Sequence, residues 1–381
     1  MTHQTHHLRI SHRDSSTSAR SGVLSLPHGD VSTPAFMPVG TAASVKAVTH
    51  RDVDALGYRL ILGNTYHLFL RPGVDVIQTA GGLHGFSNWP HNILTDSGGY
   101  QIFSLAPFRK IRDEGAYFRS HIDGSYHTLT PERVVRIQEA LGSDVQMVLD
   151  VCTGYDASRQ ESEDALHTTT QWAHRAYGEY TQTASSYEGL LFGIVQGNFH
   201  HDLRRRSAEE ICSIPFPGYA IGGLSVGEPF PVYQEFLSAT AQLLPEEKPR
   251  YVMGIGTPEY ILEAVEHGID MFDCVFPTRI ARNGTIFTRN GRVALKNERF
   301  RDDYGPLDPD MPTAFTEGYS RAYVRHLLKA GEILAPMIAT VHNLNFLAVM
   351  MQEIRDAIAG GQFLSYKQSF LRRYRGGADH G

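Results

Sequence analysis

The stretch RYVMGIGTPEYILEAVEHGIDMFD, residues 250–273, decides the fold. It begins and ends with short apolar runs, RYVMG and GIDMFD, that stop at Gly254 and at Asp273. Between the runs, Thr257 begins the tripeptide TPE, which supplies a capping threonine, a proline at the first helical position and an acidic first turn. A strand, a helix and a second strand in this order predict two neighbouring strands of a parallel sheet, because a parallel connection needs a long crossover.

The same unit recurs along the chain, and TPERVVRIQEAL at residues 130–141 is a second helix with the same start signal. Strands that are apolar on both faces and alternate with amphipathic helices indicate a parallel sheet covered by helices. Eight units predict an α/β fold of the (β/α)8 TIM-barrel class, and an open doubly wound sheet is the alternative. The eight apolar runs are Pro34–Gly40, Leu60–Asn64, Ile93–Asp96, Val145–Asp150, Leu190–Gln196, Tyr219–Gly223, Arg250–Gly254 and Gly268–Asp273.

The composition is that of an ordinary globular protein, since 41% of the 381 residues are hydrophobic and 20% are charged. The formal net charge of -6 does not indicate a nucleic-acid partner for the chain as a whole, so any basic surface has to be local. Three cysteines lie far apart, at positions 152, 212 and 274, which argues against a disulfide framework and for a reducing cytoplasm. No apolar run reaches the length of a signal-peptide core or of a membrane span of about 20 residues.

Polar residues and glycines end most of the apolar runs. In a (β/α)8 barrel the active site lies at the carboxyl ends of the strands, so these residues would share one rim. Taken singly, such residues are more often helix caps and loop residues. Taken together, in a barrel that needs an active site, they favour a function. The rim residues are Asn64, Asp96, Asp150, Gln196, Gly222, Gly223, Met253, Gly254 and Asp273.

Two carboxylates that face one substrate suit substitution at the anomeric carbon of a sugar, where one attacks and the other manages the proton of the leaving group. Gln196 and the backbone of Gly222–Gly223 could read the edge of a planar heterocycle. Tyr100 and Met253 could stack on its two faces, although a lone methionine is more often part of a core. The SGG triplet at residues 97–99 could bind an anion, but it is too short to be specific.

A local basic segment follows the last strand. Between residues 279 and 301, Glu298 is the one acidic residue. A run of charge is ordinarily a solvated face, but such an excess of positive charge in an acidic protein suggests a surface that follows phosphates. The basic residues are Arg279, Arg282, Arg289, Arg292, Lys296, Arg299 and Arg301.

Longer motifs resemble those of the bacterial tRNA-guanine transglycosylase (queuine tRNA-ribosyltransferase) family over nearly the whole chain. This family exchanges the wobble guanine of tRNAs with GUN anticodons. Its bacterial members insert 7-aminomethyl-7-deazaguanine on the way to queuosine, by double displacement through a covalent Asp–ribose intermediate. The motifs are TPAFMPVGT, ILGNTYHLFLRPG, ILTDSGGYQIFSL, FGIVQG, YAIGGLSVGEP, RYVMGIGTPE, GIDMFDCVFPTRIARNG, GPLDP, YSRAY and VHNL.

The resemblance implies a role for each rim residue. Asp273 would be the nucleophile that attacks the ribose, and Asp96 would be the general acid and base that serves the two purines. The base pocket would be formed by Ser97, Gly98, Gly99, Tyr100, Asp150, Gln196, Gly222, Gly223 and Met253. The anticodon loop would contact Gly254, Ile255, Gly256, Thr257, Pro258, Glu259, Tyr260, Thr278, Arg279, Ile280, Ala281 and Arg282.

Two positions bear on which base is inserted. Eukaryotic enzymes of this kind insert queuine, and their pocket has a glycine where this chain has Val226, whose branched side chain should crowd the larger base. Cys152 also stands where bacterial members carry cysteine, although Val151 replaces the usual glutamate before it. We therefore expect the aminomethyl base, with queuine as the alternative.

The resemblance fails at the zinc site. Bacterial members bind structural zinc through a C-x-C-x-x-C segment after GPLDP and through a downstream histidine. Here the three cysteine positions hold Met311, Thr313 and Thr316, and only His342 remains. Hydroxyl and thioether groups do not bind Zn²⁺ as thiolates do, so we predict that the zinc is absent.

We expect the packing of Met311, Phe315 and Tyr319 to replace the metal. We interpret residues 285–345 as a degenerate zinc subdomain within one transglycosylase domain that spans residues 1–381. The family's homodimer uses surfaces near this subdomain, so a homodimer is expected here as well.

Three other functions compete with base exchange. A non-catalytic tRNA-binding partner subunit would explain the zinc loss, but such a subunit should lose Asp96 and Asp273 first. An archaeosine-type enzyme should carry a C-terminal RNA-binding extension, for which a chain that ends soon after FLRRYRGG leaves no room. An unrelated metabolic barrel enzyme would bind no tRNA.

Overall fold

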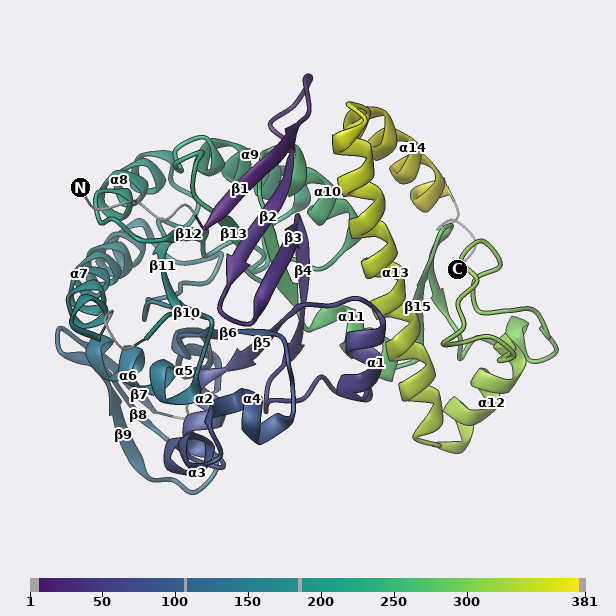
Figure 1. Cartoon of the computed structure of the whole chain (residues 1–381), viewed down its shortest axis with the longest axis horizontal. Helices are drawn as coiled ribbons and strands as arrows, with labels where there is room; N and C mark the ends of the chain where they lie inside the picture. The colour runs from purple at the N-terminus through teal and green to yellow at the C-terminus, as the bar shows by residue number, and fades with distance from the viewer. Residues whose placement is uncertain (1–6, 106–107, 184–186, 377–381) are drawn as a thin grey trace.

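The fold is a closed barrel of eight parallel strands, seen in a computed structural model that describes residues 7–105, 108–183 and 187–376 (Figure 1). The predicted barrel is confirmed, and closure of the sheet rules out the open doubly wound alternative. In sheet order the strands are β10 (Val145–Met147), β11 (Leu190–Val195), β12 (Gly218–Ile221), β13 (Arg250–Val252), β14 (Met271–Cys274), β4 (Ala35–Gly40), β5 (Leu60–Asn64) and β6 (Asn92–Asp96), and β6 pairs with β10 to close the barrel.

Helices connect the barrel strands and cover them. Thr130 begins α6 as predicted, because its side chain accepts a hydrogen bond from the backbone N–H of Arg133, and Gly142 ends the helix in the left-handed conformation. Thr257 precedes α10 without such a side-chain bond. The helices up to the last strand are α1 (His50–Ala55), α2 (Thr65–Leu70), α3 (Val74–Thr79), α4 (Gly82–Ser87), α5 (Gly99–Leu105), α6 (Pro131–Leu141), α7 (Arg159–Thr183), α8 (His201–Cys212), α9 (Phe230–Ala241) and α10 (Pro258–Glu266).

Two antiparallel sheets of three strands accompany the barrel, and neither was expected from the apolar runs. The first contains β1 (Leu8–Arg13), β2 (Arg20–Leu26) and β3 (Gly29–Thr33), and the second contains β7 (Arg109–Arg112), β8 (Gly115–Arg119) and β9 (Tyr126–Leu129). The turn between β2 and β3 lies against the start of β6, because Asn92 donates to the carbonyl of Gly29 over 2.9 Å. The second sheet follows α5 directly, so it stands beside the rim at the end of β6.

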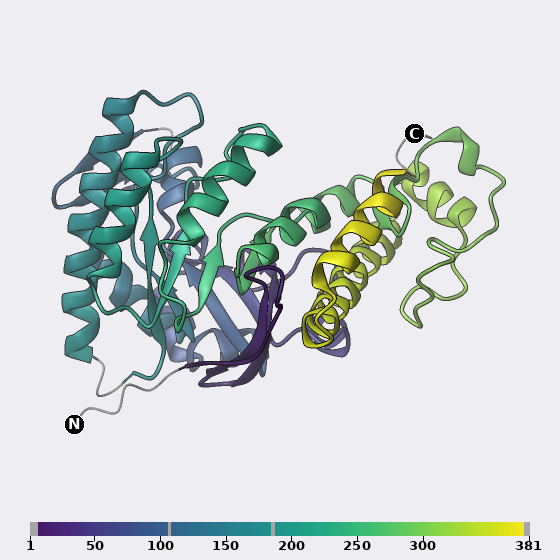
Figure 2. The same ribbon diagram turned by 90° about the horizontal axis from the view of Figure 1, so that it is seen from above.

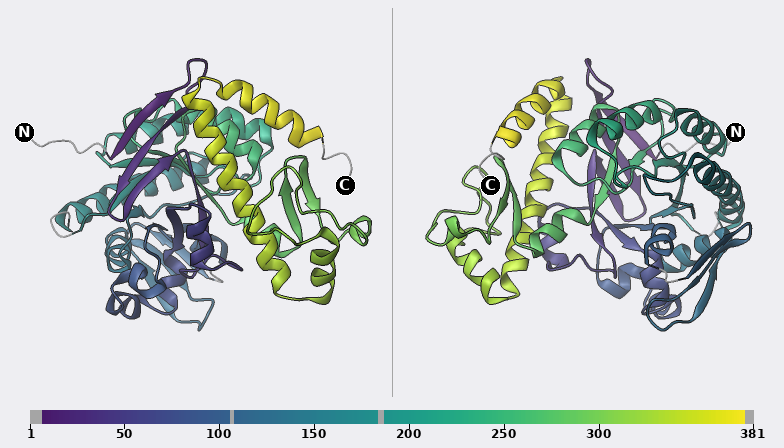
Figure 3. Two further views of the ribbon diagram at one scale, coloured as in Figure 1. Left: turned by 45° about the vertical axis from the view of Figure 1, so that its right-hand side comes forward. Right: turned by 180° about the vertical axis from the view of Figure 1, so that it is seen from behind.

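The C-terminal part of the chain lies beside the barrel, as Figures 2 and 3 show from three directions. A second, smaller core of nine buried residues between Ala281 and Ala339 holds it together. The helix α13 joins the two cores, since it contacts both β4 of the barrel and β15. The elements here are α11 (Phe276–Arg282), β15 (Thr285–Thr288), β16 (Gly291–Ala294), the short 3-10 helix η1 (Glu298–Phe300), α12 (Arg321–Ala330), α13 (Leu334–Ala359) and α14 (Phe363–Gly376).

The length and apolar composition of α13 would suit a membrane span. In this structure 67% of its most apolar window is buried against the rest of the chain, as in the core helix of a globular protein.

Candidate active site

Asp96 ends β6 and is held by three donors. The side-chain amide of Asn64 donates to Oδ2 over 2.5 Å, and the backbone N–H groups of Thr65 and Gly98 donate to Oδ1 over 3.0 and 3.2 Å. Burial, together with the charges of Asp273 and Asp150, raises the pKa of Asp96 to about 7 against the opposing effect of the N–H donors. The three rim carboxylates are therefore close enough to share one electrostatic field, and Asp96 can exist in either protonation state near neutral pH.

The SGG triplet after Asp96 has a structural reason for both of its glycines. Gly98 has a φ of +80°, and a Cβ there would lie 3.1 Å from the backbone of Tyr66. A Cβ on Gly99 would lie 2.6 Å from the carbonyl oxygen of Asp150. The anion that this turn holds is a carboxylate of the protein itself, because the N–H of Gly98 points to Asp96.

Asp273 lies in β14 and its hydrogen bonds are one-sided. The hydroxyl of Tyr251 donates to its Oδ1 over 2.5 Å, and the N–H of Gly254 donates to the same oxygen over 2.8 Å. Burial raises the pKa of Asp273, and these two bonds lower it again. The bonds thus stabilise the carboxylate form and leave Oδ2 as the oxygen that can attack a substrate. Tyr251 was not singled out in the sequence, where it is one apolar member of a strand.

Asp150 lies three residues beyond the end of β10, in a buried position. Gln196 donates from Nε2 to its Oδ2 over 2.7 Å, and Ser97 donates from Oγ to its Oδ1 over 3.2 Å. Burial raises the pKa of Asp150, while both donors lower it. A Cβ on Gly222 or on Gly223 would lie 2.6 Å from the Gln196 amide, so small residues are required at both positions.

Arg204 of α8 supports this part of the rim and was missed in the sequence. Its side chain is almost fully buried, and its guanidinium donates to the carbonyls of Gly222 over 2.7 Å and Gly223 over 3.0 Å. Burial lowers the pKa of Arg204 to about 10, which still leaves the group charged at neutral pH. In the sequence it stands first in an RRR run, which is typical of a solvent-exposed helix face, so no local pattern marks its position.

Tyr100 and Met253 lie on separate elements of the rim. Tyr100 opens α5 and is 54% exposed, so its ring is free to meet a ligand. Met253 follows β13, is half-buried and packs against the barrel core. The exposed ring of Tyr100 is therefore stronger evidence for a ligand contact than Met253, whose side chain also packs against the core.

The segments assigned to the anticodon loop differ in how much surface they offer. Exposed surface is found at Gly254 and Arg279, and partly at Thr257, Glu259, Ile280 and Arg282. The side chains of Ile255, Pro258, Thr278 and Ala281 are buried, and Gly256 is buried as well. Tyr260 packs its ring against Phe230 and Tyr233. Only the exposed and partly exposed members of the two segments therefore offer side chains to a ligand in solution.

The basic segment is only partly free to bind phosphates. Arg289 forms an ion pair with Glu353, and Arg301 lies 3.8 Å from Glu298. Arg282, on the short helix α11, is different, because its buried Nη1 has no hydrogen-bond partner. Burial and the charge of Arg279 lower the pKa of Arg282.

The residues at the family's zinc position do not form a zinc site. Met311 packs with the main core and Thr316 is buried, while Thr313 Oγ1 lies 3.5 Å from the side-chain oxygen of Asn345. His342 is buried with Nε2 2.7 Å from the carbonyl of Phe287, and burial lowers its pKa. One imidazole, one thioether and two hydroxyls do not provide four zinc ligands. Across residues 7–105, 108–183 and 187–376, no group of three His, Cys, Asp or Glu ligand atoms gathers around His342.

The three residues that were expected to pack in this region do so, and their replacement of a metal stays a prediction. Met311 and Phe315 pack with the main core, and Tyr319 packs with the second core.

Comparison with known proteins places the chain in a family. The family described as queuine tRNA-ribosyltransferase matches residues 14–376. A queuine tRNA-ribosyltransferase of Treponema denticola is 52% identical, with 97% of both chains covered. One from Pelotomaculum thermopropionicum is 53% identical, covering 96% of this chain and 98% of the relative. The chain therefore belongs to the queuine tRNA-ribosyltransferase family.

Proposed function

We propose that this enzyme exchanges the wobble guanine of GUN-anticodon tRNAs for 7-aminomethyl-7-deazaguanine, as a step toward queuosine. The observation that carries the proposal is the contrast between two rim carboxylates. Asp273 accepts two strong hydrogen bonds on one oxygen, which favours its charged form. Asp96 has its pKa raised to about 7 by burial, which suits a group that gives and takes a proton.

In the first step Oδ2 of Asp273 attacks C1′ of the guanosine. The C1′–N bond breaks, its electron pair stays on guanine, and the proton of Asp96 moves to the departing base. In the second step the incoming deazaguanine gives a proton to Asp96 and attacks C1′ through its nitrogen, which releases the Asp273 carboxylate. Each step transfers one proton and exchanges one bond, so the enzyme returns to its starting state.

The base itself would be recognised by the polar groups beyond Asp96. Hydrogen-bond donors and acceptors for the edge of a purine would come from Asp150, Gln196 and the backbone of Gly223. Gln196 also donates a hydrogen bond to Asp150. Tyr100 would stack on one face and Met253 would close the other. The guanosine has to leave the stack of the anticodon loop to reach them, as unpaired bases in recognised RNA usually do.

Incorporation of labelled guanine, aminomethyl-deazaguanine and queuine, in parallel, into GUN-anticodon tRNA tests this function. We expect guanine and the aminomethyl base to be incorporated and queuine to be excluded. Incorporation of queuine would show that the enzyme also accepts the larger base and would contradict the proposed choice of substrate. Absence of all three would favour the non-catalytic tRNA-binding subunit.

Val226 supports the smaller base, because its branched side chain is only half-buried in the loop after Gly223. The backbone of that loop is fixed by Glu228, whose carboxylate accepts the N–H of Val226 over 2.8 Å. The Val226→Gly variant should accept queuine better than the parent enzyme if this side chain limits the pocket. Equal exclusion of queuine by both enzymes would show that another residue sets the limit.

We propose further that residues 285–345 form the family's zinc subdomain without its zinc, and that the enzyme works in the cytoplasm as a homodimer. Exposed apolar side chains within this region support a dimer surface, namely Tyr323, Ile333 and Leu334. Light scattering of the purified protein should give twice the chain mass. A chain-sized mass at micromolar concentration would argue against the dimer.

A further inference from the structure

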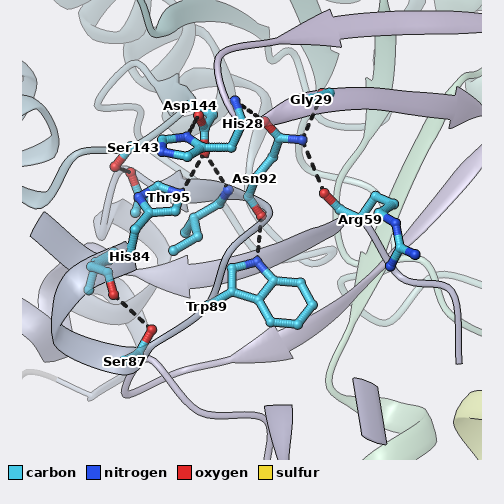
Figure 4. A network of polar contacts seen from close by, with 12 residues as sticks. His28, Gly29, Arg59, His84, Ser87, Trp89, Asn92, Thr95, Ser143 and Asp144 are labelled. Atoms are coloured by element: carbon cyan, nitrogen blue, oxygen red, sulfur yellow. Dashed lines mark hydrogen bonds and ion pairs between the residues drawn. The ribbon is translucent and has the colours of Figure 1, made fainter. Parts of the chain in front are cut away.

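A second polar cluster lies at the opposite end of the barrel from Asp96 and Asp273. His28 comes from the turn between β2 and β3, His84 from α4, and Asp144 stands directly before β10 (Figure 4). Nδ1 of His28 lies 2.6 Å from Oδ1 of Asp144, and Nε2 of His84 lies 3.1 Å from Oδ2. The two imidazole rings are stacked, with centroids 3.6 Å apart and planes 13° apart.

The cluster is fixed from behind by other groups. The carboxylate of Asp144 is buried, and its Oδ2 also accepts the N–H of Ile93 over 2.7 Å. Asn92 holds the turn that carries His28, because its side chain accepts the N–H of His28 over 3.0 Å and donates to the carbonyl of Gly29. The His28 side chain itself is 41% exposed, so solvent reaches the cluster from that side. A buried carboxylate, two imidazoles held in fixed orientations and access from solvent on one side are features of a ligand site rather than of a packed core.

The donor set suits a divalent transition metal. Two imidazole nitrogens and one carboxylate oxygen, all within 4.8 Å of one another, are the ligand types that bind zinc and its neighbours. Either ring can present a lone pair to a metal, provided that its proton is on the far nitrogen. Metal–ligand bonds of about 2.0–2.2 Å need wider spacing of the ligand atoms than the present hydrogen bonds. The partly exposed turn of His28 is the part that can move outward.

We propose that His28, His84 and Asp144 bind one divalent metal ion of the zinc class, with its remaining position open to water. In the described part of the chain this is the one group of three such side chains with that spacing. The ion would join three segments that are distant in sequence, so its binding stabilises the folded state. This site is distinct from the family's zinc position at His342, which lies in α13.

Metal binding to the chelator-treated full chain tests the site. We expect one Zn²⁺ per chain by calorimetry, visible absorption of bound Co²⁺, and a rise in Tm with added Zn²⁺. His84→Asn should weaken binding by more than the roughly 10–100-fold that loss of an outer-shell partner costs. His28→Asn, at an exposed position, should do the same and covers the case in which His84→Asn fails to fold.

The matched control is His342→Asn, which removes the family's remaining zinc ligand. It should leave Zn²⁺ affinity and the Co²⁺ spectrum unchanged. No saturable binding by the parent protein would overturn the proposal, and so would His28→Asn and His84→Asn variants that bind Zn²⁺ as tightly as the parent. Binding that is lost only in His342→Asn would place the metal at the family position instead.

A different observation concerns the outward face of β7, β8 and β9. Ala116, Phe118 and Leu129 are buried on the inner face of this sheet. On the outer face Tyr117 and Tyr126 stack at 5.5 Å, and Phe108 meets both rings edge-on. A cation lies over each ring: Lys110 over Phe108, Arg112 over Tyr117 and Arg119 over Tyr126.

In the part of the chain that the structure describes, the three cations lack an acidic partner, although Nε of Arg119 donates to the carbonyl of Gly124 over 3.1 Å. None of them forms an ion pair within the described residues, although Asp113, Glu114 and Asp123 lie in the turns at the sheet's ends. The sheet also stands next to the base pocket, since Gly99 and Asp150 line one small pocket together with Arg109 and Ile111. Exposed aromatic rings between unpaired cations form the usual platform for single-stranded nucleic acid.

We propose that this face binds unpaired nucleotides of the tRNA next to the one in the pocket, an inference that rests on the proposed function. Replacing Lys110, Arg112 and Arg119 by serine should raise the Kd for tRNA more than tenfold and lower its salt slope by about 2, at about 0.7 per phosphate on single strands. Tyr126→Ala should weaken binding without changing that slope.

The matched control replaces three exposed arginines elsewhere, Arg9, Arg51 and Arg205, by serine. This control should change neither the Kd nor the slope by as much as the sheet variant does. Equal effects of the two triple variants would mean that tRNA binding depends only on the net charge of the protein. That result would overturn the proposal that this face binds the tRNA. A parent enzyme that binds tRNA without exchanging guanine would instead contradict the proposed function.

Discussion

The barrel rim and the region around His342 differ in what holds their polar groups. At the rim, Asp96 and Asp273 together accept five hydrogen bonds, two from the side chains of Asn64 and Tyr251 and three from backbone N–H groups. Around His342, one imidazole bonds to a backbone carbonyl and the other positions pack as apolar or hydroxyl groups. The polar groups of the rim therefore satisfy one another, whereas the groups around His342 are held by packing and by single hydrogen bonds.

The two regions are nevertheless connected. The helix α11 follows β14, which carries Asp273, and contacts α13, and Asn343 of α13 donates to the carbonyl of Pro277 over 2.9 Å. The region beside the barrel thus positions α11 through packing and through a hydrogen bond from a side chain to the α11 backbone. The comparison suggests that the chemistry of the rim does not depend on a metal at His342, and the following experiments address the two regions separately.

Asp273→Asn should have the largest effect. The amide is a poor nucleophile, so the covalent tRNA adduct should be undetectable on denaturing gels, whereas tRNA binding should remain near the parent value. A persisting adduct would mean that another residue attacks. His342→Asn is the matched control from the other region, and it should form the adduct at the parent rate if the comparison holds.

The pH dependence of adduct formation should be the next largest effect. Asp96 has a pKa of about 7 because of burial, and it must be protonated to give its proton to guanine. The rate in a single turnover should therefore fall as the pH rises through about 7, approaching tenfold for each further pH unit. In Asp96→Asn that fall should vanish together with most of the rate. A profile that is flat between pH 6 and 9, roughly the range in which a pKa near 7 must appear, would contradict the assigned role.

The sequence was sufficient for the barrel and for its rim. Five of the eight apolar runs end in a polar residue, and the structure places each of these residues at, next to or just beyond the end of a barrel strand. The sequence predicted one strand over Val145–Asp150, but β10 ends at Met147. Val148 and Leu149 are buried as well, although they lie beyond the end of the strand. A buried loop and a buried strand have the same apolar composition, so the sequence could not separate them.

The supporting residues could not be predicted, because their partners are distant in sequence. Arg204 lies in an RRR run that is typical of an exposed helix face, and Tyr251 has the pattern of an ordinary strand residue. Only the fold brings Arg204 to Gly223 and Tyr251 to Asp273. The sheet after α5 was also missed, since its strands are only four or five residues long and β7 is exposed throughout. Patterns in a short stretch of sequence indicate which residues are buried and where turns occur. A hydrogen bond between residues distant in sequence leaves no such pattern.

Tyr251→Phe should have a smaller effect than either carboxylate change. It removes one of the two donors to Oδ1 of Asp273, and a hydrogen bond to a charged group contributes about 1.5–3 kcal/mol. That bond lowers the pKa of Asp273, so its loss should raise the pKa and shift the low-pH side of the rate profile toward higher pH. A lower rate with an unmoved profile would show that Tyr251 acts by packing alone.

Arg282→Ala should have the smallest effect, and it addresses the boundary between the two regions. Arg282 ends α11, and its Nη1 lacks a partner, so we expect it to bind a phosphate of the anticodon loop. The variant should bind tRNA more weakly and flatten the salt dependence by about 0.7–0.9 in slope, which corresponds to one phosphate contact. Arg289→Ala is the control, because that guanidinium is already paired with Glu353 and should leave the slope unchanged. If both variants flatten the slope equally, the region beside the barrel contributes to RNA binding as broadly as the rim does, and the distinction between the two regions is lost.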